Sequence, residues 1–150
     1  MGPDFVRWVP ADAGALADLL TGEDWPFHAA GRPDRAAVLA RAAAGHYDGP
    51  AVRTVWIVAA GERVGLVRLY DLEDEAALFD LRIRAAHRGR GLGTAAVTWL
   101  TGHLFGELAQ LTRIEATTRS DNAAMRRVLL RCGYRQEARY RRAWPVPGGE

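Results

Sequence analysis

The stretch Arg88-Gly89-Arg90-Gly91-Leu92-Gly93 is the part of the sequence whose residue types most clearly predict chemistry. It lies between an expected strand and an expected helix. Glycines there let backbone N–H groups approach a ligand closely, and the helix N-terminus adds partial positive charge. Together with the two arginines, these groups predict a site for a pyrophosphate. The alternative is a glycine-rich turn whose arginines lie in solvent.

Two common phosphate motifs fit this loop poorly. A P-loop requires a lysine, and all 20 basic residues of this chain are arginines. The pattern Gly91-x-Gly93-x-x-Ala96 matches the dinucleotide fingerprint, and Glu115 follows roughly 20 residues later. However, too few residues follow the loop for the parallel strands of that fold, and the strand before it is half polar. NAD binding is therefore disfavoured.

Hydrophobic periodicity predicts the elements that position this loop. Residues 78–84 alternate between apolar and charged side chains, as in a strand with one buried face. A helical period over 93–108 and 121–132 predicts two amphipathic helices, the second ended by Gly133. The expected strands are 5–9, 54–59, 64–70, 78–84, 113–117 and 134–144. A turn is expected at Gly61-Glu62, and two further helices are expected over 12–20 and from Pro33.

This order of elements predicts an α/β domain with an antiparallel front and a β-loop-α-β crossover behind it. The length of 150 residues fits a single domain spanning 1–150. No stretch has the length of a transmembrane helix, and the first residues lack a secretory signal. The one cysteine, Cys132, allows no internal disulfide, and no zinc pattern is present. We therefore expect a cytoplasmic protein with no bound metal and no membrane partner.

Charge is distributed unevenly along the chain. Residues 1–80 hold 7 Arg and 13 Asp+Glu, whereas residues 81–150 hold 13 Arg and 5 Asp+Glu. A basic half suits an anionic partner, either a phosphorylated cofactor or a nucleic acid. Nucleic acid is disfavoured because the arginines are not interleaved with exposed aromatic residues and no nucleic-acid motif is present.

The run from His87 to Thr94 resembles the acyl-CoA loop of the GNAT acetyltransferases. The family pattern Arg/Gln-x-x-Gly-x-Gly/Ala is met by Arg88, Gly91 and Gly93. Downstream, Asn122 opens a helix that Cys132-Gly133-Tyr134 closes, which resembles the second CoA-binding segment of the family. The run over 113–134 looks most like the branch that contains ribosomal-protein N-terminal (alanine/serine) acetyltransferases. The resemblance is strong over 64–144, and the first 50 residues match only in element order.

The resemblance implies the α/β (α+β) GNAT fold, with a mixed sheet of about six strands flanked by four helices. The usual last strand is missing, because the residues after Trp144 supply only a turn. An unpaired sheet edge of this kind invites pairing with another chain. We therefore expect either a truncated chain or a homodimer that completes the sheet.

The resemblance also implies acetyl-CoA as the co-substrate. Backbone amides of the loop would hold the pyrophosphate, and Leu81 and Ile83 would bind the pantetheine through their main chains. Asn122 would bind the pantetheine arm with its side chain, although an asparagine there also fits a helix cap. The cofactor-binding residues so implied are Leu81, Ile83, Arg88, Gly89, Arg90, Gly91, Leu92, Gly93, Thr94 and Asn122.

Enzymes of this family let an amine attack the thioester directly in a ternary complex. Asp80 and Glu115 are the candidate bases, because they are carboxylates on adjacent central strands. Each has an alternative role, in which Asp80 pairs with Arg82 and Glu115 with Arg113. The family often places a tyrosine acid seven residues after the asparagine, where this chain has Leu129. That departure puts a dedicated general acid in doubt.

An irregular aromatic segment lies where the family binds its acceptor. Trp25, Phe27 and His28 fall between the first two expected helices, and Trp144 near the end could line the same cleft. The alternative is a small core that holds a long loop in place. We expect an N-acetyltransferase acting on a primary amine, either a protein N-terminus or a small amine such as an aminoglycoside. The alternative from another class is a non-catalytic acyl-CoA-binding or regulatory module.

Overall fold

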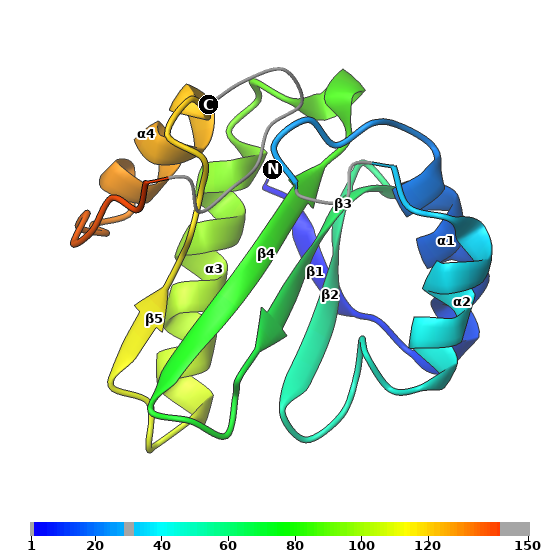
Figure 1. The fold of residues 1–150 in the computed structure, drawn as a ribbon, viewed down its shortest axis with the longest axis horizontal. Helices are drawn as coiled ribbons and strands as arrows, with labels where there is room; N and C mark the ends of the chain where they lie inside the picture. Colours follow the sequence, from blue (N-terminus) through cyan, green and yellow to red (C-terminus); the bar gives the residue numbers. More distant parts are fainter. Residues whose placement is uncertain (1, 29–31, 142–150) are drawn as a thin grey trace.

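The computed structural model describes residues 2–28 and 32–141, and within them five strands form one mixed sheet. The order across the sheet follows the order along the chain (Figure 1). Strands β1 to β4 are antiparallel, and β5 runs parallel to β4. The strands are β1 (Asp4–Arg7), β2 (Val52–Ala59), β3 (Glu62–Tyr70), β4 (Ala76–Ile83) and β5 (Arg113–Glu115).

Four α-helices cover the two faces of this sheet (Figure 1). Helices α1 (Ala13–Thr21) and α2 (Arg35–Ala43) bury one core with the indoles of Trp8, Trp25 and Trp56. Helix α3 (Leu92–Glu107) packs on the other face, and α4 (Ala123–Arg131) lies beside it. Two short 3-10 helices, η1 (Pro10–Asp12) and η2 (Ala85–His87), precede α1 and the glycine loop.

The predicted α/β fold class is confirmed, and most expected elements form with shifted ends. The hairpin between β2 and β3 turns at Ala60 and Gly61, whose positive φ angles of 52° and 76° suit a tight two-residue turn. Pro33 is not the first residue of the second helix. That helix begins at Arg35, because the Asp34 side chain accepts a hydrogen bond from Ala37 N at 3.2 Å and caps it.

The strand expected over 134–144 is not formed in its described part, residues 134–141. Gly133, with φ 85°, turns the chain after α4, and the residues that follow contact β4, α3 and β5 through side chains without pairing as a strand. The Tyr134 ring packs edge-on against Phe79, and its hydroxyl lies 2.8 Å from Thr101 Oγ1. The described sheet therefore has five strands where about six were expected. Trp144 lies outside the described residues.

Gly65 allows β3 and β4 to approach closely at the end that faces the glycine loop. A Cβ atom at this position would collide with the backbone oxygen of Arg82. Gly65 pairs with Ile83, so any shift would move the last residues of β4. Glycine is therefore required here by close backbone contact, although its φ angle is one that other residues adopt.

We predict that Gly65→Ala lowers the free energy of unfolding by about 1–3 kcal/mol, because the added methyl group must displace strand backbone. Gly102→Ala is the matched control, since a Cβ there meets nothing within 4 Å in the middle of α3. Alanine in a helix should leave stability unchanged or raise it by about 0.5–1 kcal/mol. Urea unfolding of both variants checks this, and equal midpoints would contradict it.

Candidate active site

Strands β4 and β5 separate shortly after they pair. The parallel ladder joins Ala76–Leu78 to Arg113–Glu115 and then ends, although β4 continues to Ile83 (Figure 1). Beyond this point β4 has β3 on one side and no strand on the other. The structure therefore opens a wedge between β4 and the chain that follows β5.

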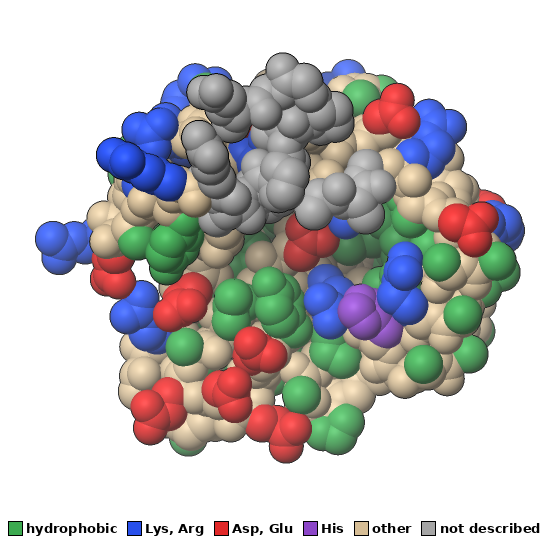
Figure 2. All heavy atoms as spheres, in the orientation of Figure 1, with side chains coloured by type: hydrophobic (Ala, Val, Ile, Leu, Met, Phe, Trp, Pro, Cys, Tyr) green, Lys and Arg blue, Asp and Glu red, His purple; other side chains and the backbone are tan. Residues whose placement is uncertain are grey.

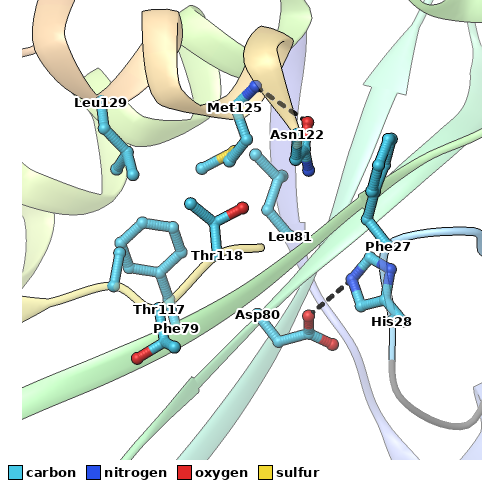
Figure 3. A pocket seen from close by; sticks show the side chains of 11 residues that line it. Phe27, His28, Phe79, Asp80, Leu81, Thr117, Thr118, Asn122, Met125 and Leu129 are labelled. Carbon is cyan, nitrogen blue, oxygen red and sulfur yellow. Dashed lines mark hydrogen bonds and ion pairs between the residues drawn. The ribbon is translucent and has the colours of Figure 1, made fainter. Parts of the chain in front are cut away.

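A pocket occupies this wedge (Figure 3). Its walls come from β4, from the residues after β5, from the start of α4 and from the loop that follows α1. The lining residues are Phe27, His28, Phe79, Asp80, Leu81, Ala116, Thr117, Thr118, Asn122, Met125 and Leu129. The same side of the molecule is hollowed near its centre, with charged side chains around the hollow (Figure 2).

The backbone of Leu81 and Ile83 points into the wedge. Arg84 N donates to Val64 O on β3, so β4 residues at even numbers hydrogen bond to β3. Main-chain groups alternate in direction along a strand, so those of Leu81 and Ile83 point the opposite way. Ile83 O already accepts from Arg88 Nε at 2.9 Å. Leu81 N–H and C=O and Ile83 N–H are the groups left to bind a ligand.

The glycine loop follows directly after the end of β4. Gly89 and Gly91 have φ angles of 76° and 78°, a left-handed backbone that side chains with a Cβ rarely adopt. Gly91 is the N-cap of α3, so the first free amides of that helix open beside the loop. Arg88 N donates to Ala85 O, so the loop amides still free to bind an anion lie after Arg88. The loop and helix thus form a place suited to an anion.

Side chains hold the loop on both flanks. The Arg88 guanidinium contacts two segments. Its Nε donates to Ile83 O at the end of β4, and its Nη2 lies 3.5 Å from Glu23 Oε1, in the loop after α1. Arg90 is exposed. A Cβ at Gly93 would lie 3.4 Å from Val128 and 3.7 Å from Ile83, because α3, α4 and β4 meet there. Leu92 is buried and Thr94 is half-buried in the first turn of α3.

Asn122 caps helix α4 and lines the pocket (Figure 3). Its Oδ1 accepts a hydrogen bond from Met125 N at 3.1 Å. The helix-cap role considered for this residue is therefore present. Because the cap uses only Oδ1, Nδ2 is the atom left to donate to a ligand, so the two roles are compatible.

The aromatic segment 25–28 has a buried part and a part that lines the pocket. Trp25 is 1% exposed and belongs to the core under α1, where its Nε1 donates to Leu20 O at 2.9 Å. Phe27 and His28 line the pocket. The structure therefore brings Phe27 and His28 to the site and uses Trp25 to support them.

Arg119 ties this segment to the chain after β5. Its Nη1 donates to Pro26 O at 2.7 Å, and its guanidinium lies 5.3 Å from the centre of the Phe27 ring. Two further hydrogen bonds reach Asp121, at 3.1 and 2.7 Å. Arg119 is thus a bridge across the pocket, and its side chain is only 14% exposed.

The two candidate bases are placed differently. Asp80 lines the pocket, with Oδ1 2.8 Å from His28 Nε2 and Oδ2 3.1 Å from Arg82 Nε. Burial raises the pKa of Asp80, but the hydrogen bond from His28 and the guanidinium of Arg82 outweigh it and bring the pKa to about 2. Such a carboxylate stays ionised at neutral pH and accepts protons poorly.

Glu115 is not among the residues that line the pocket. Its carboxylate lies 3.0 Å from Arg113 Nε, the ion pair considered for it from sequence, and Arg113 also pairs with Glu137. The divergence of the strands brings Asp80 and not Glu115 to the opening.

Sequence reasoning did not identify Thr117, Thr118, Met125 or Arg119 as parts of the site. The two threonines follow β5 where a longer strand was expected, so their position depends on where pairing with β4 ends. The helical period over 121–132 does place Met125 and Leu129 on one apolar face of α4. Nothing in that period indicates that this face is only partly covered and closes the pocket.

In the described part of the chain, no three His, Cys, Asp or Glu side chains converge as metal ligands would. Within the same residues, no helix combines the length and apolar character needed to span a membrane.

Several solved acetyltransferase structures share this fold. RimL, a ribosomal-protein α-N-acetyltransferase with coenzyme A, has a TM-score of 0.82 and 15% identity over 99% of this chain and 88% of its own. Spermidine N-acetyltransferase from Vibrio cholerae with CoA and spermine has a TM-score of 0.79 and 17% identity over 96% and 87%. Aminoglycoside acetyltransferase AAC(6')-Ib with ribostamycin and coenzyme A has a TM-score of 0.75 and 20% identity over 91% and 85%.

No curated protein sequence matches the chain. The sequence pattern of the acetyltransferase (GNAT) domain does match it, over residues 5–135. That span holds the whole described sheet except the first residue of β1, together with the glycine loop and α4. The chain therefore belongs to the GNAT acetyltransferase family.

Proposed function

We propose that this chain is an acetyl-CoA-dependent N-acetyltransferase that acetylates a primary amine. The observation that carries the proposal is the unpaired edge of β4, which runs past the pocket and leads directly into the glycine loop. Pantetheine would complete the edge at Leu81 and Ile83, and Asn122 Nδ2 would bind it from the opposite side. The amides from Gly89 to Thr94 would hold the pyrophosphate.

The amine would attack the thioester carbonyl directly, with the CoA thiolate as leaving group. A main-chain N–H of Leu81 or Ile83 would stabilise the oxyanion that develops at the carbonyl oxygen. Leu129 lines the pocket where the family often has a tyrosine, so no side-chain acid stands there. A thiol with a pKa of about 8.5 leaves readily as the thiolate without a side-chain acid.

The lining of the pocket favours an acceptor with a single amine. Among the described residues that line it, Asp80 is the one carboxylate, and it already contacts His28 and Arg82. A polycation would find little free negative charge there. A peptide N-terminus is therefore the acceptor class that we favour over a polyamine or an aminoglycoside, although similar acetyltransferase structures hold ribostamycin or spermine.

We expect a short peptide with a free N-terminal alanine or serine to be acetylated faster than spermidine or ribostamycin. Release of the CoA thiol at saturating acetyl-CoA measures all three reactions on one scale. Faster turnover of spermidine or ribostamycin would contradict the assignment of the acceptor. Saturable CoA binding with no turnover of any amine would instead favour a non-catalytic acyl-CoA-binding module.

We predict that Gly91→Glu weakens desacetyl-CoA binding at least about tenfold, or about 1.4 kcal/mol. The new side chain strains a left-handed residue and brings a carboxylate to the phosphate position. Gly45→Glu is the matched control, because Gly45 is also left-handed, with φ 83°, but follows α2. Calorimetric titration of both variants checks this, and equal affinities would mean that the loop does not bind CoA.

A further inference from the structure

A histidine and an aspartate from distant parts of the chain meet inside the pocket (Figure 3). His28 Nε2 lies 2.8 Å from Asp80 Oδ1, with the two side chains 21% and 33% exposed. His28 belongs to the segment after α1, whereas Asp80 is on β4 next to Leu81. Both groups therefore lie at the end of the wedge where the thioester of a bound acyl-CoA would stand.

The position of the imidazole is held by buried neighbours. His28 N donates to Trp25 O at 3.0 Å, and the two rings meet edge to face at 6.2 Å. Trp25 is itself buried and hydrogen bonded to Leu20 O. The ring of His28 thus packs against the fixed indole of Trp25. Rotation of His28 away from Asp80 would break this contact with Trp25.

In its contact with His28, Asp80 is the ionised hydrogen-bond acceptor. Its Oδ1 faces Nε2 of His28, and its Oδ2 faces Nε of Arg82. Arg68 on β3 is its cross-strand partner. The carboxylate is therefore ionised and only accepts hydrogen bonds. It follows that Nε2 of the imidazole carries a hydrogen, and that in the neutral ring Nδ1 has the free lone pair.

We propose that His28 is the general base of the acetyl transfer and that Asp80 is a positioning residue that acts through it. The proposal rests on the proposed N-acetyltransferase function. As the C–N bond forms and the C–S bond breaks, the amine nitrogen loses its proton to Nδ1 of His28, and CoA leaves as the thiolate. Asp80 keeps the ring in one tautomer and balances the positive charge that forms on it.

This proposal changes the roles first expected for the two residues. Asp80, expected as a base, becomes the orienting carboxylate, and His28, expected to bind the acceptor, becomes the proton acceptor. In the described part of the chain, the charged groups next to Asp80, Trp25 and Phe27 are arginines and one carboxylate. Arg82 on β4 and Arg68 on β3 lie beside Asp80, Arg82 and Arg88 lie over the Trp25 ring, and Arg119 lies over Phe27. The carboxylate is Glu23, which contacts Arg84 and Arg88.

The test compares wild type with His28→Gln and Asp80→Asn, using the peptide with a free N-terminal alanine and saturating acetyl-CoA. His103→Gln is the matched control, because His103 also lies near a carboxylate, 3.5 Å from Glu107, but on α3 away from the pocket. For His28→Gln we expect kcat at neutral pH to fall about 10²–10⁴-fold while KM for the peptide changes little.

The pH profile separates catalysis from structural support. In wild type, kcat should fall as the pH drops, because a general base must be unprotonated to accept the proton of the amine. In His28→Gln this limb should disappear, leaving only the titration of the acceptor amine at higher pH. Asp80→Asn should lower kcat at least about tenfold and keep the KM. An unchanged profile in His28→Gln would overturn the proposal, even with reduced kcat.

A second measurement does not depend on turnover. Nitrogen-15 spectra of the histidine rings should show His28 protonated on Nε2 in wild type and a mixture of tautomers in Asp80→Asn. Protonation on Nδ1 alone in neutral wild-type His28 would overturn the proposal. Wild type that binds CoA but acetylates no amine would contradict both the proposed function and this inference. Active wild type whose kcat is unchanged in His28→Gln would contradict the inference alone.

Discussion

The separation of β4 from β5 is the constraint on which the rest of the site depends. Backbone N–H and C=O groups are strong hydrogen-bonding groups, and leaving them unpaired away from water costs free energy. Three residue pairs join the two strands, and the remaining edge of β4 is left open. An extended polar ligand such as a pantetheine arm can complete this edge as a strand would, so the sheet itself provides the binding surface.

Local signals in the sequence were enough to predict one half of this arrangement. The glycine-rich loop, the alternation of β4 and the two helices on either side of β5 depend on neighbouring residues, and all of them are present. The capping role of Asn122 is also local. These features predicted the glycine loop and its place between strand and helix.

The other half depends on tertiary contacts that no local pattern records. The sequence of β5 permits a longer strand, and only the divergence from β4 ends it at Glu115. Residues 134–141 were expected to begin a strand, but Tyr134 packs against Phe79 and lies beside Thr101 instead. The contact between His28 and Asp80 likewise joins segments that only the folded sheet brings together. Both residues were expected in the site from sequence, but nothing in the sequence indicated that they would contact each other.

Arg119 gives this architecture one more property. It joins the aromatic segment 25–28 at Pro26 to the residue before Asn122, so the two sides of the pocket share one guanidinium. A ligand that orders one side would reduce the conformational entropy that the other side must lose when its own ligand binds. Two ligands bound on these two sides would then be thermodynamically linked, and the linkage would be reciprocal. Bound coenzyme would in this way prepare the pocket for the amine, and the amine would hold the coenzyme more tightly.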